Sequence, residues 1–373
     1  MKRIGILTGG GDCPGLNGAI KWVVKTSISN LTETKSETVE VIGIREGWKG
    51  LLMCDPAKIY PPGTNLDGDV WLEQLTEAEV RSWDILGGTL LGTSRTNPFN
   101  KKNDRSSLLI ENISKLRLDA LVAIGGEDTL SVAAKLSEKG IPVVGIPKTI
   151  DKDLWGTDYS IGFESAVNVI TEEIDRLRTT ANSHRRVFVV ETMGRHAGHL
   201  ALQGGIAAGA YIILIPEFDF NMDQVCKLVE ERRNRGVKYS IVIAAEGAKE
   251  AGKHLVFRDT KEDDFQHKAL GGIANHIANT ITTQTGIETR SLVLSHLQRG
   301  GIPSAYDRRM ARHFGIAAVN LIEMKKFGEM ASYLEGRFTS TPLKDVLGKQ
   351  TLVNISQEYD TERYNGKRKT LTS

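Results

Sequence analysis

The sequence predicts an α/β protein with two similar three-layer lobes, each built on a mainly parallel sheet. Short apolar runs bounded by glycine or proline alternate with helical patterns along the chain, which is typical of parallel sheets covered by helices on both faces. The chain has 373 residues, more than one hydrophobic core usually organises. Two lobes are therefore expected.

Eight short apolar runs are expected to form strands. They lie at residues 3–7, 39–44, 120–124, 143–146, 186–190, 212–215, 240–244 and 291–294. A helix should follow the first strand, because Asp12 can cap it and Leu16, Ile20 and Val23 form an apolar stripe. A second helix is expected over residues 163–179, where apolar residues recur on one face.

Two segments differ from this pattern. Residues 60–81 begin with a turn-rich stretch and continue as a polar helical pattern, which predicts a surface insertion. Residues 349–373 form a polar C-terminal tail. We expect this tail to be a solvated terminus or a strap on a neighbouring subunit.

Charge and cysteine content exclude several classes of protein. There are 48 Lys and Arg against 46 Asp and Glu, a formal net charge of +2, so neither nucleic acid nor an anionic membrane is an expected partner. No apolar run approaches the ~18 residues of a membrane span. The apolar start of the chain ends at once in glycines and reads as a strand rather than a signal peptide. The three cysteines are widely spaced, which suits a reducing cytoplasm.

The first glycine turn follows the first expected strand. Gly9, Gly10 and Gly11 precede a helix start, where backbone N–H groups and the helix dipole favour a phosphate. No Gly-Lys-Ser/Thr follows, so the turn is not a Walker A motif. A purely structural tight turn fits this pattern equally well.

The second turn adds acidic groups. Residues 120–124 lead into Gly125, Gly126, Glu127, Asp128 and Thr129. Two carboxylates beside phosphate-binding glycines require a cation between them, which predicts Mg²⁺ bound by Glu127 and Asp128. The alternative is that both residues only cap the next helix.

The third turn is the most informative. Lys148, Thr149, Asp151 and Asp153 follow the strand at 143–146. Phosphoryl transfer needs a cation on the phosphates, a metal ligand and a base for the attacking hydroxyl, and this turn supplies all three. Solvated loop charges are the alternative.

These turns, in this order, resemble the phosphofructokinase family. The similarity extends from Arg3 to about Leu347 and is carried by the strings LTGGGDCPGLNGAI, GGTLLGTSR, GGEDT, PKTIDKD, GTDYSIGFESA, IDRLR, ETMGRHAG, ETR and SHLQRGG. It implies the family's fold of two Rossmann-like lobes. Residues 1–162 with 298–348 would bind the phosphoryl donor and metal, and residues 163–297 would bind the sugar phosphate.

The resemblance also implies roles on the donor side. Asp151 would be the catalytic base acting on the sugar's 1-hydroxyl, with Thr149 and Asp153 beside it to hold the phosphoryl group and the metal's water shell. Arg95 would reach the transferring phosphate. The donor itself would lie against Gly10, Gly11, Asp128 and Lys148.

On the sugar side, the resemblance implies one set of residues for the sugar and one for its phosphate. Met193, Gly194 and Arg195 would line the sugar pocket, and Glu246 would accept a sugar hydroxyl. The distal phosphate would be held by Arg186, Arg290, His296 and Arg299. In the family the first two of these reach in from a neighbouring subunit, which implies a homodimer or homotetramer. Taken singly, Arg290 could instead form an interface salt bridge and His296 could be a core histidine.

Three positions bear on the donor and the base. Family members that use pyrophosphate carry aspartate at the position of Asp128 and commonly lysine at that of Lys148, so the resemblance implies reversible transfer from pyrophosphate to fructose 6-phosphate, in glycolysis or gluconeogenesis. ATP as donor, sedoheptulose 7-phosphate as acceptor and a non-catalytic sugar-phosphate sensor remain alternatives. Lys152 replaces the usual asparagine, and its charge should lower the affinity of Asp151 for protons.

Overall fold

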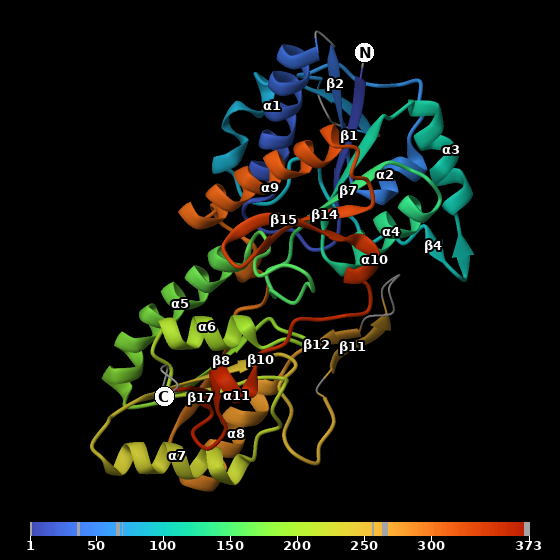
Figure 1. Ribbon diagram of the computed structural model, residues 1–373. Coiled ribbons are helices and arrows are strands. Elements are labelled where there is room, and N and C mark those ends of the chain that lie inside the picture. The colour runs from blue at the N-terminus through green and yellow to red at the C-terminus, as the bar shows by residue number, and fades with distance from the viewer. Residues whose placement is uncertain are drawn as a thin grey trace.

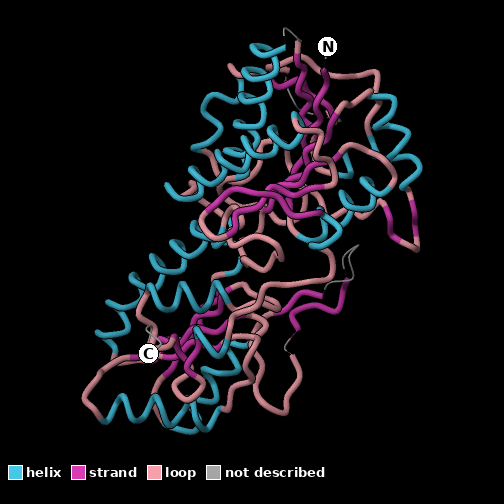
Figure 2. The backbone as a smooth tube through the Cα atoms, in the orientation of Figure 1, coloured by secondary structure: helices cyan, strands magenta, loops and turns pink. Residues whose placement is uncertain are grey.

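The computed structural model has two α/β lobes (Figure 1), which confirms the predicted fold class. It describes residues 2–35, 38–64, 68, 70–255, 257–262 and 268–368. The strands fall into two groups, one in each lobe (Figure 2). A long helix, α5 (Phe163–His184), begins near the larger lobe and runs along the smaller one.

The larger lobe contains a seven-stranded sheet. Its strands, in spatial order, are β15 (Arg337–Pro342), β14 (Glu329–Leu334), β7 (Val143–Pro147), β6 (Ala120–Gly125), β1 (Lys2–Thr8), β2 (Val39–Ile44) and β3 (Leu72–Leu75). The five inner strands are parallel, and the two edge strands β15 and β3 are antiparallel to their neighbours. A parallel sheet must be covered on both faces.

The alternation of side chains along β1 shows how that covering is achieved. Ile4 and Ile6 belong to the core under α1 (Leu16–Lys35) and α9 (Ala305–Glu323). Leu7 belongs to the core on the opposite face. That face is covered by α2 (Trp48–Met53), α3 (Ser106–Leu116), α4 (Glu127–Glu138) and α10 (Leu343–Val346).

The smaller lobe contains a four-stranded parallel sheet. Its spatial order is β13 (Thr289–Val293), β8 (Val187–Thr192), β10 (Ser240–Ala245) and β9 (Ile212–Leu214). Besides α5, the helices next to this sheet include α6 (His199–Ala207), α7 (Met222–Asn234) and α8 (Ile273–Thr285). The short pairs β4 (Phe99–Asn100) with β5 (Asn103–Asp104) and β11 (Phe257–Glu262) with β12 (Lys268–Leu270) lie outside both sheets.

Each of the eight predicted strands overlaps an observed strand, and both predicted helices form. The capping role of Asp12 is wrong, because α1 begins only at Leu16. Asp12 and Pro14 instead lie in the turn before it. The second helix, α5, continues five residues beyond the predicted end, to His184.

The segment at residues 60–81 differs from the prediction of a polar helix. Leu72–Leu75 forms the edge strand β3, in which Leu72 and Leu75 are buried. Glu73 is also buried, and its carboxylate pairs with the guanidinium of Arg45 at 3.1 Å. This partner allows an acidic residue to lie inside the sheet edge. The following helical stretch, η1 (Glu79–Ile85), is a 3₁₀ helix.

The C-terminal tail is not a solvated terminus over its described residues. It forms α11 (Ile355–Glu358), β16 (Tyr359–Asp360) and β17 (Asn365–Gly366) on the smaller lobe. The Tyr359 hydroxyl donates to the carbonyl of Ile213 at 2.6 Å, and the Ile213 N–H donates to the carbonyl of Tyr364 at 2.6 Å. Both tyrosines are buried, so two aromatic side chains anchor an otherwise polar segment. Residues 369–373 lie outside the described residues.

A buried carboxylate joins the lobes. Asp307, in α9, accepts hydrogen bonds from the Tyr159 hydroxyl (2.8 Å), the Gly162 N–H (2.7 Å), and the N–H and hydroxyl of Ser165 (2.8 and 2.6 Å). These partners surround the start of α5. Asp307 therefore fixes the direction in which the chain leaves the larger lobe.

Candidate active site

A cavity of about 410 Å³ is lined by residues from both lobes. On the larger-lobe side its walls come from the turns after β1, β6 and β7, which are adjacent strands. On the smaller-lobe side they come from the segments after β8, β10 and β13, which are also adjacent. The carboxyl ends of parallel strands are where α/β proteins bind ligands, and here two such edges contribute to one cavity.

The structure brings the predicted donor-side residues together. The cavity is lined on that side by Gly10, Gly11, Arg95, Gly126, Glu127, Asp128, Thr129, Lys148, Thr149, Asp151 and Asp153. The loop that carries Arg95 packs on the glycine turn, because the Gly10 N–H donates to the Ser94 carbonyl at 3.1 Å. Gly10 has φ 78°, a conformation that glycine adopts without strain.

Lys148 is buried at the junction of the first and third turns. Its ammonium donates to the backbone carbonyl of Gly11. Burial lowers the pKa of Lys148 to about 8. A lysine in this state carries its charge near neutral pH and has little water to screen it, so it would attract an anion strongly.

Asp151 is a buried carboxyl group. Burial raises its pKa, and the positive charges of Arg299 and Lys148 oppose that rise. One of its oxygens, Oδ1, has no hydrogen-bond partner among the described residues. Lys152 does not give Asp151 the lowered proton affinity that was predicted: its ammonium lies over the ring of Phe163, 5.3 Å from the centroid, and the net pKa of Asp151 is raised. Burial, which raises proton affinity, dominates at Asp151 instead.

Asp153 and Glu127 place further negative charge beside Asp151. Burial raises the pKa of Asp153, and the charges of Asp151 and Glu127 raise it further. Glu127 accepts a hydrogen bond from the Gly348 N–H at 3.0 Å. No group of three or more His, Cys, Asp or Glu side chains within the described ranges is arranged to hold a metal by itself. A divalent cation that also bound phosphate oxygens would need fewer protein ligands.

The smaller-lobe wall contains most of the predicted sugar-side residues. It is formed by Met193, Arg195, His196, Glu246, Leu270, Ser295, His296 and Arg299. Burial, followed by the charge of Asp151, raises the pKa of Glu246 to about 7. Arg299 spans the two walls, because its Nη1 donates to the Asp12 carbonyl at 3.2 Å.

Three predicted residues lie outside the cavity wall. Gly194 supports the wall from its backbone, with φ 125° and a carbonyl that accepts from the Gly247 N–H at 3.1 Å. Arg186 and Arg290 both pair with Glu288, at 2.8 and 2.7 Å. In a single chain these two arginines therefore do not reach the site.

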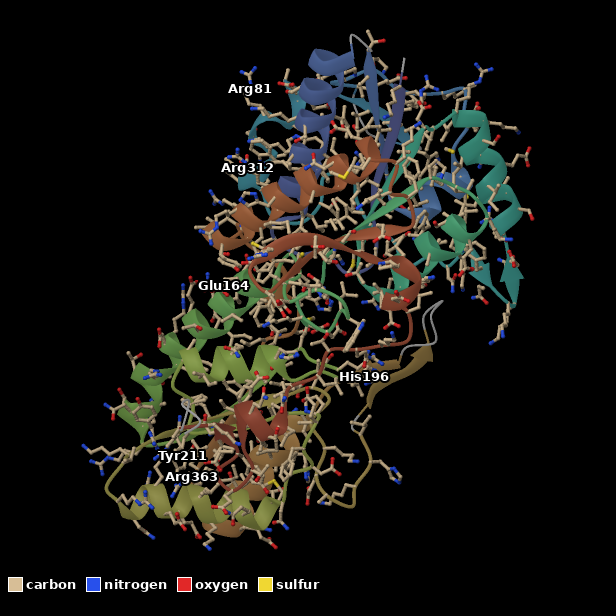
Figure 3. The ribbon with its side chains drawn as sticks, viewed as in Figure 1. Arg81, Glu164, His196, Tyr211, Arg312 and Arg363 are labelled. Carbon is tan, nitrogen blue, oxygen red and sulfur yellow. The ribbon has the colours of Figure 1, made fainter. Side chains whose placement is uncertain are left out.

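Several lining residues were missing from the sequence prediction. Thr129 and His196 directly follow predicted site residues, and Ser295 directly precedes one. Their place in the sequence beside those residues could have identified them. His196 lies between the lobes (Figure 3). Gln350 gave none, because it belongs to a tail expected to lie away from the site.

Comparison with known proteins gives a consistent family match. The family described as Phosphofructokinase matches residues 3–322. A pyrophosphate--fructose 6-phosphate 1-phosphotransferase of Amycolatopsis methanolica is 46% identical over 330 residues, covering 88% of this chain and 90% of the relative. An ATP-dependent 6-phosphofructokinase 3 of Streptomyces coelicolor is 43% identical over the same shares of both chains. A pyrophosphate-dependent phosphofructokinase of Marinobacter aquaeolei has a similar fold, with TM-score 0.78, 23% identity, and coverage of 99% of this chain and 89% of that one.

Proposed function

The chain belongs to the phosphofructokinase family, and from that membership we propose that it transfers a phosphoryl group from pyrophosphate to the 1-hydroxyl of fructose 6-phosphate. The supporting observation is the cavity in which phosphate-binding turns of one lobe and a polar wall of the other meet at the buried Asp151. The larger lobe holds the donor in this proposal, and the smaller lobe holds the sugar phosphate.

Pyrophosphate as donor is supported by two charged residues. Asp128 lies in the first turn of α4 and lines the cavity. Its carboxylate occupies space that the α-phosphate of a nucleotide would need, and its negative charge repels that phosphate. Lys148 offers a buried ammonium to the donor's phosphates. Pyrophosphate brings no adenosine to bind, so dense positive charge must replace those contacts.

The carboxylates of the donor side would hold a magnesium ion together with the donor's phosphates. Glu127, Asp128 and Asp153 line the same cavity. Burial raises the pKa of Asp153 most, and the negative charges of Asp151 and Glu127, which a cation would neutralise, raise it further. Bound there with the donor, Mg²⁺ would neutralise phosphate charge during transfer. Its remaining ligands would be phosphate oxygens and water.

The chemical step follows from the position of Asp151. Its carboxylate takes the proton of the sugar's 1-hydroxyl as that oxygen bonds to phosphorus. The bond between phosphorus and the bridging oxygen of pyrophosphate breaks, and orthophosphate leaves. Arg95 stabilises the charge on the transferring group. The two phosphoryl donors, pyrophosphate and the bisphosphate product, have similar transfer potential, so the reaction runs in both directions and serves glycolysis or gluconeogenesis.

The sugar phosphate would be held by the smaller-lobe wall. Arg195 and Glu246 contact the sugar, and His296 and Arg299 bind its distal phosphate. Arg186 and Arg290 would complete that phosphate site in a neighbouring subunit, because they lie away from the cavity of their own chain. The functional unit in this proposal is a homodimer or homotetramer.

No described helix is both long and apolar enough to cross a membrane. We place the enzyme in the cytoplasm, where its proposed substrates are found.

The second candidate function uses ATP as donor. It is favoured by the ATP-dependent relative at 43% identity. A non-catalytic sensor is disfavoured, because Asp151, Asp153, Thr149 and Glu127 all line the cavity. The test is a comparison of donors on pure enzyme with fructose 6-phosphate and Mg²⁺. Turnover with pyrophosphate supports the proposal, turnover with ATP alone overturns the donor, and binding without turnover supports a sensor.

A further inference from the structure

Residues 348–353, the crossing segment, connect the two lobes beside the cavity. On the larger-lobe side this segment pairs with the chain just after Asp151. The Thr351 N–H donates to the Asp153 carbonyl at 2.8 Å, and the Thr351 hydroxyl donates to the Leu154 carbonyl at 3.1 Å. The Gly348 N–H reaches the carboxylate of Glu127 at 3.0 Å. The crossing segment therefore contacts the turns after β6 and β7, two of the loops that carry the proposed donor-side groups.

Thr351 and Val353 of the same segment are hydrogen-bonded to the smaller lobe. The Thr351 carbonyl lies 3.1 Å from Nε2 of His199, at the start of α6. The Val353 N–H donates to the Glu217 carboxylate at 2.9 Å, and the same carboxylate accepts from the Gly198 N–H at 2.9 Å. Thr351 is thus hydrogen-bonded to both lobes: its N–H and hydroxyl to the larger lobe, and its carbonyl to the smaller one.

The protonation state of His199 follows from its surroundings. The ring is buried, and burial lowers its pKa, so it is neutral near pH 7. A carbonyl oxygen can only accept a hydrogen bond. Nε2 therefore carries the proton and donates it to Thr351.

We propose that Thr351 and His199 are positioning residues, which hold the loop of Asp151 and Asp153 at a fixed separation from the sugar-binding lobe. This inference rests on the proposed function, in which donor and acceptor occupy different lobes. Each substrate alone would keep most of its contacts if the crossing segment loosened, because Gln350 is the one residue of that segment among the cavity's described lining residues. The transfer step needs both at once, because small errors in the distance between reacting atoms reduce the rate steeply.

The test compares two replacements of His199. His199→Phe keeps the bulk but removes the donor, and His199→Gln restores an N–H near the position of Nε2. We expect kcat to fall about tenfold in H199F, with the dissociation constant of each substrate changed less than about twofold, and H199Q to recover most of kcat. A rise in KM with kcat unchanged, or equal kcat in H199F and H199Q, would overturn the positioning role.

A matched control separates positioning from general stability. Asn365 anchors the same tail to the smaller lobe only, through hydrogen bonds to the carbonyls of Ala210 and Tyr211 at 2.9 Å. Asn365→Ala should lower Tm and leave kcat unchanged, and an equal fall of kcat in N365A and H199F would contradict the proposal. Should H199F not fold, Thr351→Val removes only the hydroxyl bond to Leu154, and it should give the same selective loss of kcat.

Hydrogen exchange provides a readout that does not depend on turnover. The amides of Thr351 and Val353 should exchange faster in H199F than in the parent protein and N365A, because they are bonded to opposite lobes. Unchanged exchange would overturn the tie between the lobes. Absence of phosphoryl transfer in the parent protein would instead count against the proposed function, with the exchange result still judging the crossing segment.

Discussion

Lys148, at the end of β7, donates a hydrogen bond from its ammonium to the backbone carbonyl of Gly11, in the turn after β1. Because β6 lies between these strands, the bond spans the edge of the sheet at which the donor would bind. It holds the ammonium against the glycine turn. The position of the charge is therefore fixed before any ligand arrives.

The first prediction concerns the alkaline side of the pH profile. The pKa of Lys148 is lowered to about 8 by burial, so the side chain is charged below that pH and neutral above it. We expect kcat/KM for pyrophosphate to fall above about pH 8. In Lys148→Arg this alkaline limb should disappear, because a guanidinium stays protonated. A parent profile that is flat from pH 7 to 9.5 would contradict the assignment.

The second prediction concerns the acidic side. Burial and the charge of Asp151 raise the pKa of Glu246 to about 7, so the carboxylate proposed to accept a sugar hydroxyl becomes protonated as pH falls below 7. We expect kcat/KM for fructose 6-phosphate to decline below about pH 7. Glu246→Gln should have a lower kcat/KM and a shallower acidic limb, and the remaining fall should come from Asp151 and Asp153, whose pKa values burial also raises. A limb near pH 6 should remain in both proteins, because the substrate's own phosphate titrates there.

The three turns of the larger lobe could be predicted from the sequence, whereas Gln350 and the strand β3 could not. The β1, β6 and β7 turns were identifiable because glycines and carboxylates follow apolar runs in sequence. Their proximity then follows from the parallel sheet alone. The position of Gln350 could not be predicted, because it is set by the hydrogen bonds of its neighbours. Gly348 is bonded to Glu127 and Thr351 to Asp153, and both of these partners are distant in sequence. The strand β3 was missed for a similar reason, since Glu73 is stabilised by Arg45, a partner 28 residues away.

The third prediction concerns the junction of the lobes. Asp307 accepts four hydrogen bonds shorter than 2.9 Å from the start of α5 and its neighbours. Asp307→Asn would turn one acceptor oxygen into a donor facing other donors, at a cost of about 2–4 kcal/mol. Calorimetry should show Tm lowered by several degrees. Asp345 is exposed, so Asp345→Asn is the matched control. An equal Tm in both variants would show that Asp307 does not stabilise the junction of the lobes.

The last prediction concerns donor choice at Asp128. In Asp128→Gly the cavity gains room and loses a negative charge. We therefore expect kcat/KM for ATP to rise about tenfold or more and kcat/KM for pyrophosphate to fall by about as much. Each tenfold change corresponds to about 1.4 kcal/mol in the activation free energy. Glycine in the first turn of α4 also weakens the helix by about 1 kcal/mol, so Tm must be measured alongside.

Asp128→Asn separates the two physical causes, because the amide keeps the size of the side chain and removes its charge. If lack of room excludes the nucleotide, D128N should still reject ATP although D128G accepts it. If charge excludes it, both variants should accept ATP. If both variants reject ATP and still turn over pyrophosphate, Asp128 does not select the donor. The groups that select it would then lie elsewhere along the wall formed by the first and third turns.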